Sequence, residues 1–409
     1  MRYVESFFKN PVALRQEGDG SSKTLPRCRL SERRLIMIYL DYAANTPADP
    51  KVLEAFIDTE KHFGGNPNSS HPAGHAAREK LTETTGRIAG LLGIQAPEVI
   101  YTSGASEANN LAVKGIARAQ RNYGKHIIST ALEHPSVSGP LTWLQEQGYE
   151  IDLLDIRRDG KIDTEHLREL LRHDTVLVAV TAVDSELGVV QPVSEIVEIV
   201  RGFPNCMLHV DATQAIGKIP FSFAGLDTVS LAAHKFYGLN GSGLLFKRGN
   251  FVIDPLIHGG SGASLYRSGT PTLALAAALE AALELSLDHL PERLEKVKAL
   301  NRMLREALSQ YPAVRINSPE DAVPHILNVS VAGIRGTEMQ RLLAEKGVCV
   351  SVKSACSTEG APSKAVFAVS RDRKNALSSW RISLSHLTTK EEIAEFMKIF
   401  DSCIKETGV

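Results

Sequence analysis

The sequence predicts an α/β protein with a large, mostly parallel seven-stranded sheet and a smaller α+β domain. Between residues 98 and 248, short β-branched segments alternate with helical patterns, as in parallel strands joined by covering helices. After about residue 270, strands and helices no longer simply alternate. The chain of 409 residues is also long enough for two domains.

Seven short apolar segments with turn residues at their ends are predicted to be the strands of the large sheet. In chain order they are EVIYTSG (98–104), KHIISTA (125–131), YEIDLLD (149–155), TVLVAVTAV (175–183), CMLHVDA (206–212), TVSLAAH (228–234) and GLLFKR (243–248). Four helical patterns between them cover residues 106–122, 135–148, 164–174 and 193–203.

The C-terminal part begins with a long helical tract, residues 271–310, in which Pro291 predicts a break. Two further helices are expected around GTEMQRLLAEKG and from TTKEEIAEFMKIFDSC, with strands at HILNVSV, VCVSV and WRISLS. We predict a large domain over residues 47–285 and a small domain from residues 37–46 plus 286–409. Residues 1–36 are polar and lack the apolar core of a secretory signal, so we expect a disordered leader or a misassigned start before Met37.

Charge and cysteine content exclude several classes of function. The net charge is −1, from 46 basic and 47 acidic residues, so bulk electrostatics recruits neither nucleic acid nor a membrane. No apolar run approaches the ~18 residues of a spanning helix. The five cysteines are scattered and form no CxxC pair, which indicates a reducing, cytoplasmic setting and no metal site built from this chain alone.

Two charged residues at predicted strand ends indicate a cofactor. Lys235 lies in SLAAHKFYG, and Asp211 lies in LHVDATQAIGK just after an apolar strand. Strand C-termini are where ligands bind in open α/β sheets. An acid that keeps a pyridinium nitrogen protonated and a lysine that forms a Schiff base are two groups that pyridoxal 5'-phosphate requires. By itself, however, a lysine is usually a solvated surface group.

The segment YTSGASEANNLAVKG predicts a cradle for the phosphate. Gly104, small residues and Ser106 precede a helix expected to begin near Glu107, whose free N–H groups and dipole would face an anion. The alternative is an ordinary turn capped by Ser106. His134 follows another strand, where an imidazole could stack on a cofactor ring or satisfy only local hydrogen bonds.

Taken in order, these motifs resemble the aminotransferase class V family, and within it the cysteine desulfurases of the NifS/IscS type. The resemblance runs from YLDYAANTPADP (39–50) to about residue 402. It includes GGNPNSSH, TSGASE, EH, ELGVVQP, HVDATQ, HK, RSGT, SAC and WRISLS. It implies a pyridoxal-phosphate enzyme of fold type I, with the cofactor in the large domain and a homodimer that shares its active sites.

The resemblance also implies the chemistry. Lys235 would hold the cofactor and, with His134, transfer protons, so that L-cysteine becomes L-alanine. Cys356, in VSVKSACSTEG, would take the sulfur as a persulfide and pass it to an acceptor protein for iron–sulfur cluster assembly or for tRNA or cofactor thiolation. No metal is expected, although a transient contact between Cys356 and an iron–sulfur cluster is left open. Lys353 would favour the thiolate.

The remaining site residues are carried over from the family motifs. Arg381, helped by Asn66, would bind the substrate carboxylate, and Gln214 would bind the cofactor's phenolic oxygen. The other expected cofactor contacts are Asp211, His134, Ser185, Ala105, Ser106, His234 and, from a second subunit, Thr270.

Several positions depart from the family pattern and keep two alternatives open. Ser185 replaces an asparagine, Ala232 replaces a serine or threonine, Lys353 replaces a glycine, and Gly262 and Ala263 replace polar residues. One alternative is another class V enzyme, an aminotransferase or a lyase, although transamination needs no thiol. The other is a non-catalytic homologue in a sulfur-transfer complex.

Overall fold

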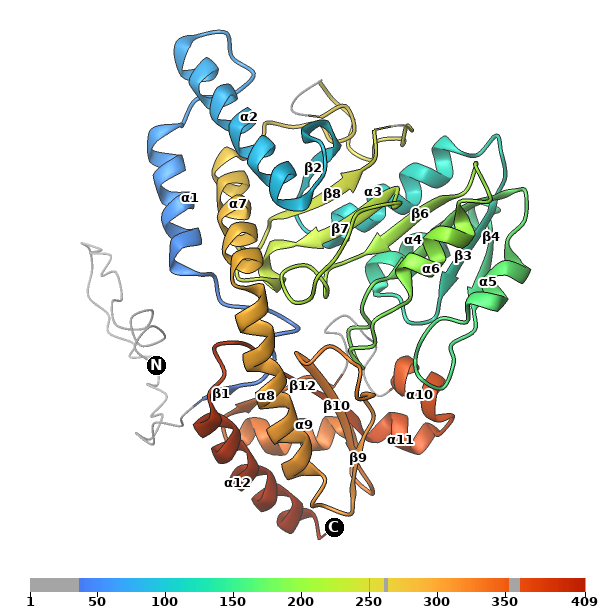
Figure 1. Cartoon of the computed structure of the whole chain (residues 1–409), viewed down its shortest axis with the longest axis vertical. Coiled ribbons are helices and arrows are strands. Elements are labelled where there is room, and N and C mark those ends of the chain that lie inside the picture. The colour runs from blue at the N-terminus through green and yellow to red at the C-terminus, as the bar shows by residue number, and fades with distance from the viewer. Residues whose placement is uncertain (1–36, 250, 261–263, 353–360, 409) are drawn as a thin grey trace, which may run out of the picture. The chain divides into compact units, whose positions relative to one another are not determined.

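The computed structural model describes residues 37–249, 251–260, 264–352 and 361–408 (Figure 1). Its largest sheet has seven strands in the order β2-β8-β7-β6-β5-β3-β4. All neighbouring pairs are parallel except those made by β8, which runs antiparallel to β2 and β7. The strands are β2 (Val99–Thr102), β3 (His126–Thr130), β4 (Glu150–Leu154), β5 (Thr175–Thr181), β6 (Met207–Asp211), β7 (Thr228–Ala232) and β8 (Gly243–Lys247). The seven predicted strands and the mostly parallel sheet are confirmed.

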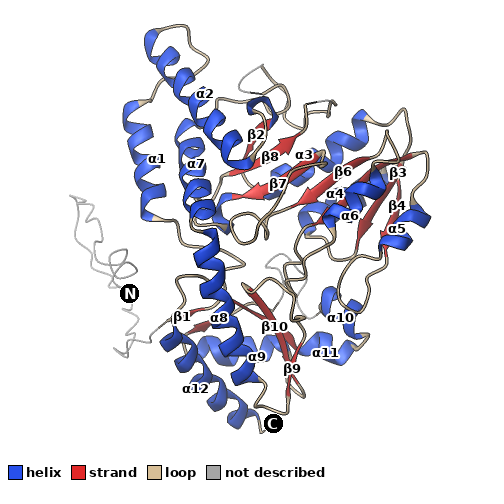
Figure 2. Ribbon diagram, in the orientation of Figure 1, coloured by secondary structure: helices blue, strands red, loops and turns tan. Residues whose placement is uncertain are grey.

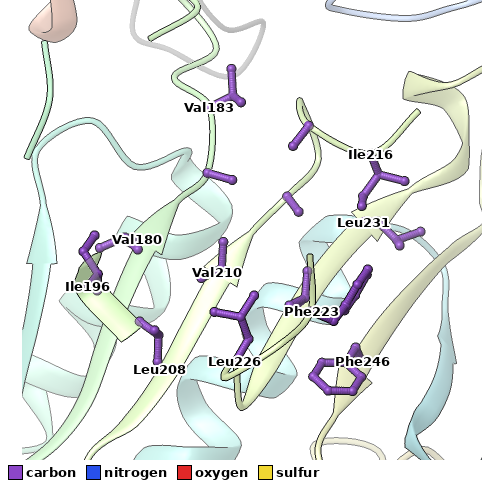
Figure 3. Packing of buried hydrophobic residues seen from close by; sticks show 14 of the residues in the cluster. Val180, Val183, Ile196, Leu208, Val210, Ile216, Phe223, Leu226, Leu231 and Phe246 are labelled. Carbon is purple, nitrogen blue, oxygen red and sulfur yellow. The ribbon is translucent and has the colours of Figure 1, made fainter. Parts of the chain in front are cut away.

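Helices cover both faces of this sheet (Figure 2). Successive residues of a strand point to opposite faces, so each face of the sheet has apolar side chains that a helix can bury. On β5, Val178 and Val180 belong to one apolar cluster, whereas Leu177 and Ala179 belong to another. The first cluster, part of which is drawn in Figure 3, includes residues of α5 and α6, and the second includes residues of α3 and α4. These helices are α3 (Ala105–Ala119), α4 (Pro135–Glu146), α5 (Thr164–Leu170) and α6 (Val193–Val200).

A separate apolar core is built by the C-terminal third together with residues 38–40. It contains Trp380, Phe396 and Phe400, all fully buried. The sheets beside it have the orders β12-β10-β9 and β1-β11. The strands are β1 (Ile38–Tyr39), β9 (Val314–Ile316), β10 (Ile326–Val331), β11 (Val348–Cys349) and β12 (Ser379–Ser383), and the helices are α8 (Leu290–Leu308), α9 (Gly336–Glu345) and α12 (Lys390–Thr407). The predicted domain boundaries stay a prediction.

The helical tract after residue 270 breaks where the sequence indicated. Helix α7 (Leu273–Asp288) ends and α8 begins at Leu290, with Pro291 in the first turn, where its missing N–H costs nothing.

Other elements differ from expectation. Helices α1 (Pro50–His62) and α2 (Pro72–Leu92) were not anticipated, and neither were α10 (Lys364–Ser370) and α11 (Arg373–Ser378), which lie between Cys356 and Arg381 in the sequence. No helix among the described residues is long and apolar enough to span a membrane.

The turn that opens α3 lies directly against β8, so the sheet fixes its position. A Cβ added to Gly243 would lie 2.6 Å from Gly104 Cα and 2.7 Å from the Leu231 carbonyl oxygen, which only glycine avoids. We expect Gly243→Ala to lower the free energy of unfolding in urea by about 1–3 kcal/mol, as overpacking usually does.

Gly86 provides the matched control. It lies inside α2, and an added Cβ would meet nothing within 4 Å. Gly86→Ala should therefore be neutral or raise the free energy of unfolding by up to about 1 kcal/mol. Equal effects of the two substitutions would contradict the close contact at Gly243.

Candidate active site

A cavity of about 340 Å³ lies at the carboxyl ends of strands β5, β6 and β7. Nine of the residues predicted from the sequence line it: Ala105, Ser106, His134, Ser185, Asp211, Gln214, His234, Lys235 and Arg381. Ala232, one of the departures from the family pattern, also lines it.

Three predicted residues are not part of this lining. Asn66 is exposed, and its Oδ1 accepts a hydrogen bond from the backbone N–H of Asn68 at 2.9 Å. Thr270 is exposed as well. Cys356 lies outside the described residues, as do Lys353, Gly262 and Ala263. Their predicted roles stay predictions.

Lys235 ends a short 3₁₀ turn, Ala233–Lys235, that directly follows β7. Its Nζ donates hydrogen bonds to the carbonyl oxygens of Ala43, at 2.9 Å, and Ala44, at 2.7 Å. The amine is thus held at the cavity wall by a backbone segment some 190 residues away in the sequence.

Asp211, at the end of β6, is buried and held by two donors. Its Oδ2 accepts from Asn109 Nδ2 at 2.8 Å, and its Oδ1 accepts from the backbone N–H of Thr213 at 3.0 Å. The two hydrogen bonds hold the carboxylate in place.

Asn109 is fully buried on α3 and uses both ends of its amide. Its Nδ2 also donates to Ser136 Oγ at 2.8 Å, while its Oδ1 accepts from His209 Nε2 at 3.0 Å and from Ser230 Oγ. Burial lowers the pKa of His209 to about 4, so this imidazole is neutral. One asparagine therefore joins β6, β7 and α4 to the Asp211 carboxylate.

His134 is the N-cap of α4, and the cap fixes its tautomer. Its Nδ1 accepts from the backbone N–H of Ser136 at 3.1 Å and lies 2.8 Å from Ser136 Oγ. Burial lowers the pKa of His134, which keeps the ring neutral, so the hydrogen-bond network assigns its proton to Nε2.

The N-terminus of α3 is open toward the cavity. Gly104, not Ser106, is the N-cap, with φ +143°, and no side chain caps the helix. The interpretation of Ser106 as a capping residue was therefore wrong, because the helix begins at Ala105 and Ser106 is inside its first turn. Residues 103–107 line the cavity, where the helix dipole favours an anion.

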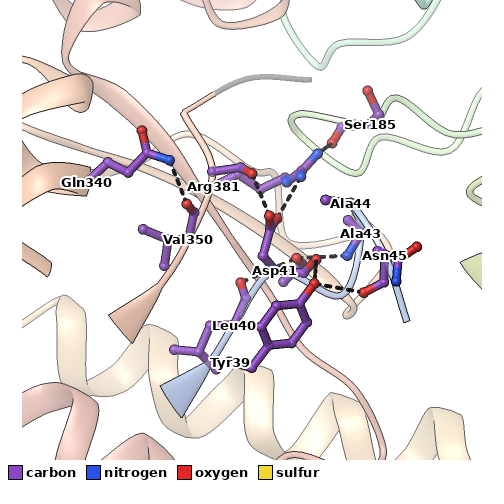
Figure 4. Close-up of polar contacts among 12 residues, drawn as sticks. Tyr39, Leu40, Asp41, Ala43, Ala44, Asn45, Ser185, Gln340, Val350 and Arg381 are labelled. Atoms are coloured by element: carbon purple, nitrogen blue, oxygen red, sulfur yellow. Dashed lines mark hydrogen bonds and ion pairs between the residues drawn. The ribbon is translucent and has the colours of Figure 1, made fainter. Parts of the chain in front are cut away.

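Arg381 lies on β12 between Trp380 and Ile382 of the C-terminal apolar core. It is 2% exposed and lines the cavity; its contacts are drawn in Figure 4. Its Nη2 donates to Asp41 Oδ1 at 2.9 Å, and its Nη1 donates to the Ser185 carbonyl oxygen at 2.8 Å. Ser351 Oγ donates to Asp41 Oδ2 at 2.8 Å, which holds the carboxylate in place. Arg381 Nε is buried and has no partner among the described residues.

The residues present fit pyridoxal phosphate. The cavity combines a lysine amine, a buried carboxylate and an open helix N-terminus, which match the cofactor's aldehyde, pyridine nitrogen and phosphate. Two buried polar atoms on lining residues, Thr213 Oγ1 and Arg381 Nε, lack a hydrogen-bond partner in the described part of the chain. Buried polar groups are rarely left in this state, so a polar ligand is expected.

Sequence reasoning missed three residues of this site. Asp41 lies within the quoted motif YLDYAANTPADP and Asn109 within TSGASEANN, but nothing in either motif shows which side chain each one contacts. Thr213 lies between two predicted residues, and its proximity to Asp211 was the one available signal.

Glu133, next to His134, gives the site a measurable pH dependence. It is buried, with 8% of its surface exposed, and burial raises its pKa from 4.5 to about 8, with Asp211 and Asp184 adding to the effect. Its Oε1 accepts from Thr130 Oγ1 at 2.8 Å and from the Thr181 N–H at 2.9 Å. The carboxyl group is therefore protonated at neutral pH.

Because the folded-state pKa is raised, the stability from protonated Glu133 is complete below pH ~4.5 and is lost as pH rises through about 8. We expect Glu133→Gln to remove this loss. In urea unfolding between pH 5 and 8, the free energy of unfolding of the variant should rise relative to that of the wild type by up to about 1.4 kcal/mol per pH unit. Glu79→Gln, at an exposed site on α2, should run parallel to the wild type. Parallel curves for Glu133→Gln would show that Glu133 is ionised.

Comparisons with known proteins identify relatives along nearly the whole described chain. The family described as Aminotransferase class-V matches residues 38–396. The "NifS/IcsS protein homolog" of Lactobacillus delbrueckii subsp. bulgaricus is 36% identical over 371 residues, covering 89% of this chain and 96% of the relative. "Cysteine desulfurase IscS" of Dictyoglomus turgidum is 35% identical over 374 residues, covering 90% and 95%.

Solved structures agree with these relatives. A structure titled "NIFS-LIKE PROTEIN" superposes with a TM-score of 0.85 at 32% identity, covering 91% of this chain and 100% of its own. "SspA in complex with cysteine" superposes with a TM-score of 0.74 at 29% identity, covering 86% and 99%. The resemblance found in the motifs thus extends through the fold and the cavity, and the chain belongs to the aminotransferase class-V family as a NifS/IscS-like member.

Proposed function

We propose that this protein is a pyridoxal-phosphate-dependent cysteine desulfurase, which converts L-cysteine to L-alanine and passes the sulfur onward through Cys356. The observation that carries the proposal is the single cavity shared by Lys235, Asp211, His134 and Arg381. Relatives named cysteine desulfurase, 32–36% identical over most of the chain, support the same activity.

The cavity residues divide into groups that would hold the cofactor. Lys235 would attach it through Nζ, Asp211 would pair with its pyridine nitrogen, and His134 would lie against its ring. Gln214 would bind the phenolic oxygen, and Ala105, Ser106 and His234 would bind the phosphate. Burial, with Lys235 and Lys218, lowers the pKa of His234 to about 4, so it would donate as a neutral ring. When bound, the cofactor supplies an electron sink for bonds at the substrate's α-carbon.

Arg381 is suited to bind the carboxylate of L-cysteine. Asp41 and the Ser185 carbonyl each take one hydrogen bond from its guanidinium and so fix its plane, while Nε stays available. A planar guanidinium held in this way offers parallel N–H donors to a carboxylate. Asn66 would help from the segment before α2.

Two groups on the cavity wall can move protons. Lys235 lines the cavity, and its Nζ would act as a base toward the substrate when it is not bound to the cofactor. His134 is neutral at physiological pH, with its proton on Nε2 and its Nδ1 committed to Ser136. It can therefore exchange a proton only through Nε2.

Cys356 is the proposed sulfur acceptor because it occupies the position of the family's loop cysteine in SAC, and the described cysteines are poor nucleophiles. Burial raises the pKa of Cys206, Cys349 and Cys403, so each is a protonated thiol at neutral pH. A thiolate is required for attack on sulfur. In the proposed step, the Cys356 thiolate bonds to the substrate sulfur as the carbon–sulfur bond breaks, and the substrate carbon gains a proton and leaves as alanine.

We also propose that the enzyme is a homodimer in which Thr270 of one subunit completes the phosphate site of the other. Thr270 is exposed and does not line the cavity of its own chain. It adjoins a groove of about 740 Å³ between α2, β2 and residues 264–275, whose lining includes Leu265, 75% exposed. The sulfur acceptor would be an iron–sulfur scaffold or a thiolation protein.

The activity is tested with purified protein, pyridoxal phosphate, L-cysteine and a thiol reductant. We expect alanine and sulfide from the wild type, and a loss of more than ~100-fold in both for Cys356→Ala, with the absorbance of lysine-bound cofactor retained. Cys349→Ala is the matched control and should keep both products. Cofactor binding without alanine would favour another class V enzyme, and a colourless protein would favour the non-catalytic alternative.

The shared site is tested by co-expressing Lys235→Ala and Thr270→Ala chains with different tags. If Thr270 acts across the interface, the hybrid dimer has one intact site and recovers about half of the wild-type activity. If Thr270 acts within its own chain, every site carries a defect and no activity returns. Light scattering of the wild type should give a dimer mass, and a monomer would contradict the proposal.

A further inference from the structure

Lys218 is a buried lysine close to the cavity, although it is not part of its lining. It lies in the turn after β6 and is only 6% exposed. Its Nζ donates to Gln214 Oε1 at 2.5 Å, which is the one hydrogen bond that the described residues provide for it. No carboxylate of the described residues forms an ion pair with Lys218 Nζ. A buried amine without a carboxylate is costly, so its position calls for an explanation.

The contacts of Gln214 allow only one orientation of its amide. The carbonyl oxygen of Ala43 can only accept, and it lies 2.9 Å from Gln214 Nε2, so the NH₂ end must face it. The other end, Oε1, then faces Lys218 Nζ, which donates. The two contacts demand the same orientation. One hydrogen on Nε2 remains, for which the described residues offer no acceptor, and Gln214 lines the cavity.

We propose that Lys218 is a positioning residue that locks the Gln214 amide, so that its NH₂ end donates to the phenolic oxygen of the bound cofactor. Without Lys218, Oε1 would be buried and unpaired, and the amide would lose the contact that opposes rotation. This inference rests on the proposed function, because it needs pyridoxal phosphate in the cavity.

The charges around Lys218 fit an anionic oxygen at this position. Burial lowers the pKa of Lys218 well below its usual value, and the positive charges of Lys235 and Arg381 lower it further. Lys218 in turn helps to lower the pKa of His234 to about 4 and of buried His325 to about 3. The groups that face Lys218 are thus cationic or neutral, and a phenolate in the cavity would offset this excess of positive charge.

The test is the pH midpoint of the visible absorbance of the lysine-bound cofactor. A hydrogen bond to the phenolic oxygen stabilises the phenolate, which then attracts the proton on Lys235 Nζ less strongly. The proton is therefore lost at a lower pH, and the midpoint falls. Lys218→Met keeps the length of the side chain but removes the donor. We expect the midpoint to rise by about one pH unit. Lys218→Gln can still donate and should stay within about 0.3 pH units of the wild type.

A double-mutant cycle shows whether Lys218 acts through Gln214. In a Gln214→Met background, Lys218→Met should shift the midpoint by less than about 0.3 pH units. An equal shift in both backgrounds, no shift with Lys218→Met, or the same shift with Lys218→Gln as with Lys218→Met would overturn the inference and leave the proposed function intact. A wild type that forms no lysine-bound cofactor would overturn both. Should Lys218→Met not fold, Lys218→Arg, which keeps the donor, must retain the wild-type midpoint.

Discussion

Residues 41–46 join the two apolar cores to the cavity, and the site depends on their backbone. The Ala43 carbonyl oxygen accepts from both Lys235 Nζ and Gln214 Nε2, at 2.9 Å each. Ser383 Oγ accepts from the Ala43 N–H, and Thr46 hydrogen-bonds to the His234 carbonyl oxygen through its N–H and its Oγ1. The segment is thus hydrogen-bonded to β12 through Ser383 and to the turn after β7 through His234 and Lys235.

The second constraint is polar and fully buried. Asn109 has no unused hydrogen-bonding capacity, because both amide hydrogens and the carbonyl oxygen have partners. Networks of this kind stabilise one arrangement strongly, since any change leaves a buried polar group unpaired. The Asp211 carboxylate and the His134 cap are fixed through the same side chain.

Groups of both charges lie in and near the cavity. Lys218 and Lys235 donate to Gln214 and to the Ala43 carbonyl oxygen, whereas Arg381 is paired with Asp41. Burial and neighbouring acids keep Glu133 protonated at neutral pH, and burial with Glu186 raises the pKa of Asp184 to about 7. A cofactor that carries an anionic phosphate and phenolic oxygen together with a cationic pyridinium nitrogen suits a cavity that offers groups of both charges.

By itself, the sequence determined the strands, the order of the sheet's elements along the chain and nine residues of the cavity lining. These follow from local patterns: β-branched runs between turns, glycine before a helix, and charged residues at strand ends. Lys235, Asp211 and His134 could be found because each lies at or shortly after the end of a strand that the pattern marks.

Only the tertiary structure decided how distant segments meet. Asp41 finds Arg381 across 340 residues, and Asn109 finds Asp211 across 102. Lys218 is four residues from Gln214, but its role depends on Ala43, which the fold brings to the other end of the same amide. Hydrogen bonds of this kind leave no periodic pattern in the sequence, because they depend on which distant segments the folded backbone brings together. Propensity and motif order therefore predict which residues reach the cavity, and packing decides what holds them there.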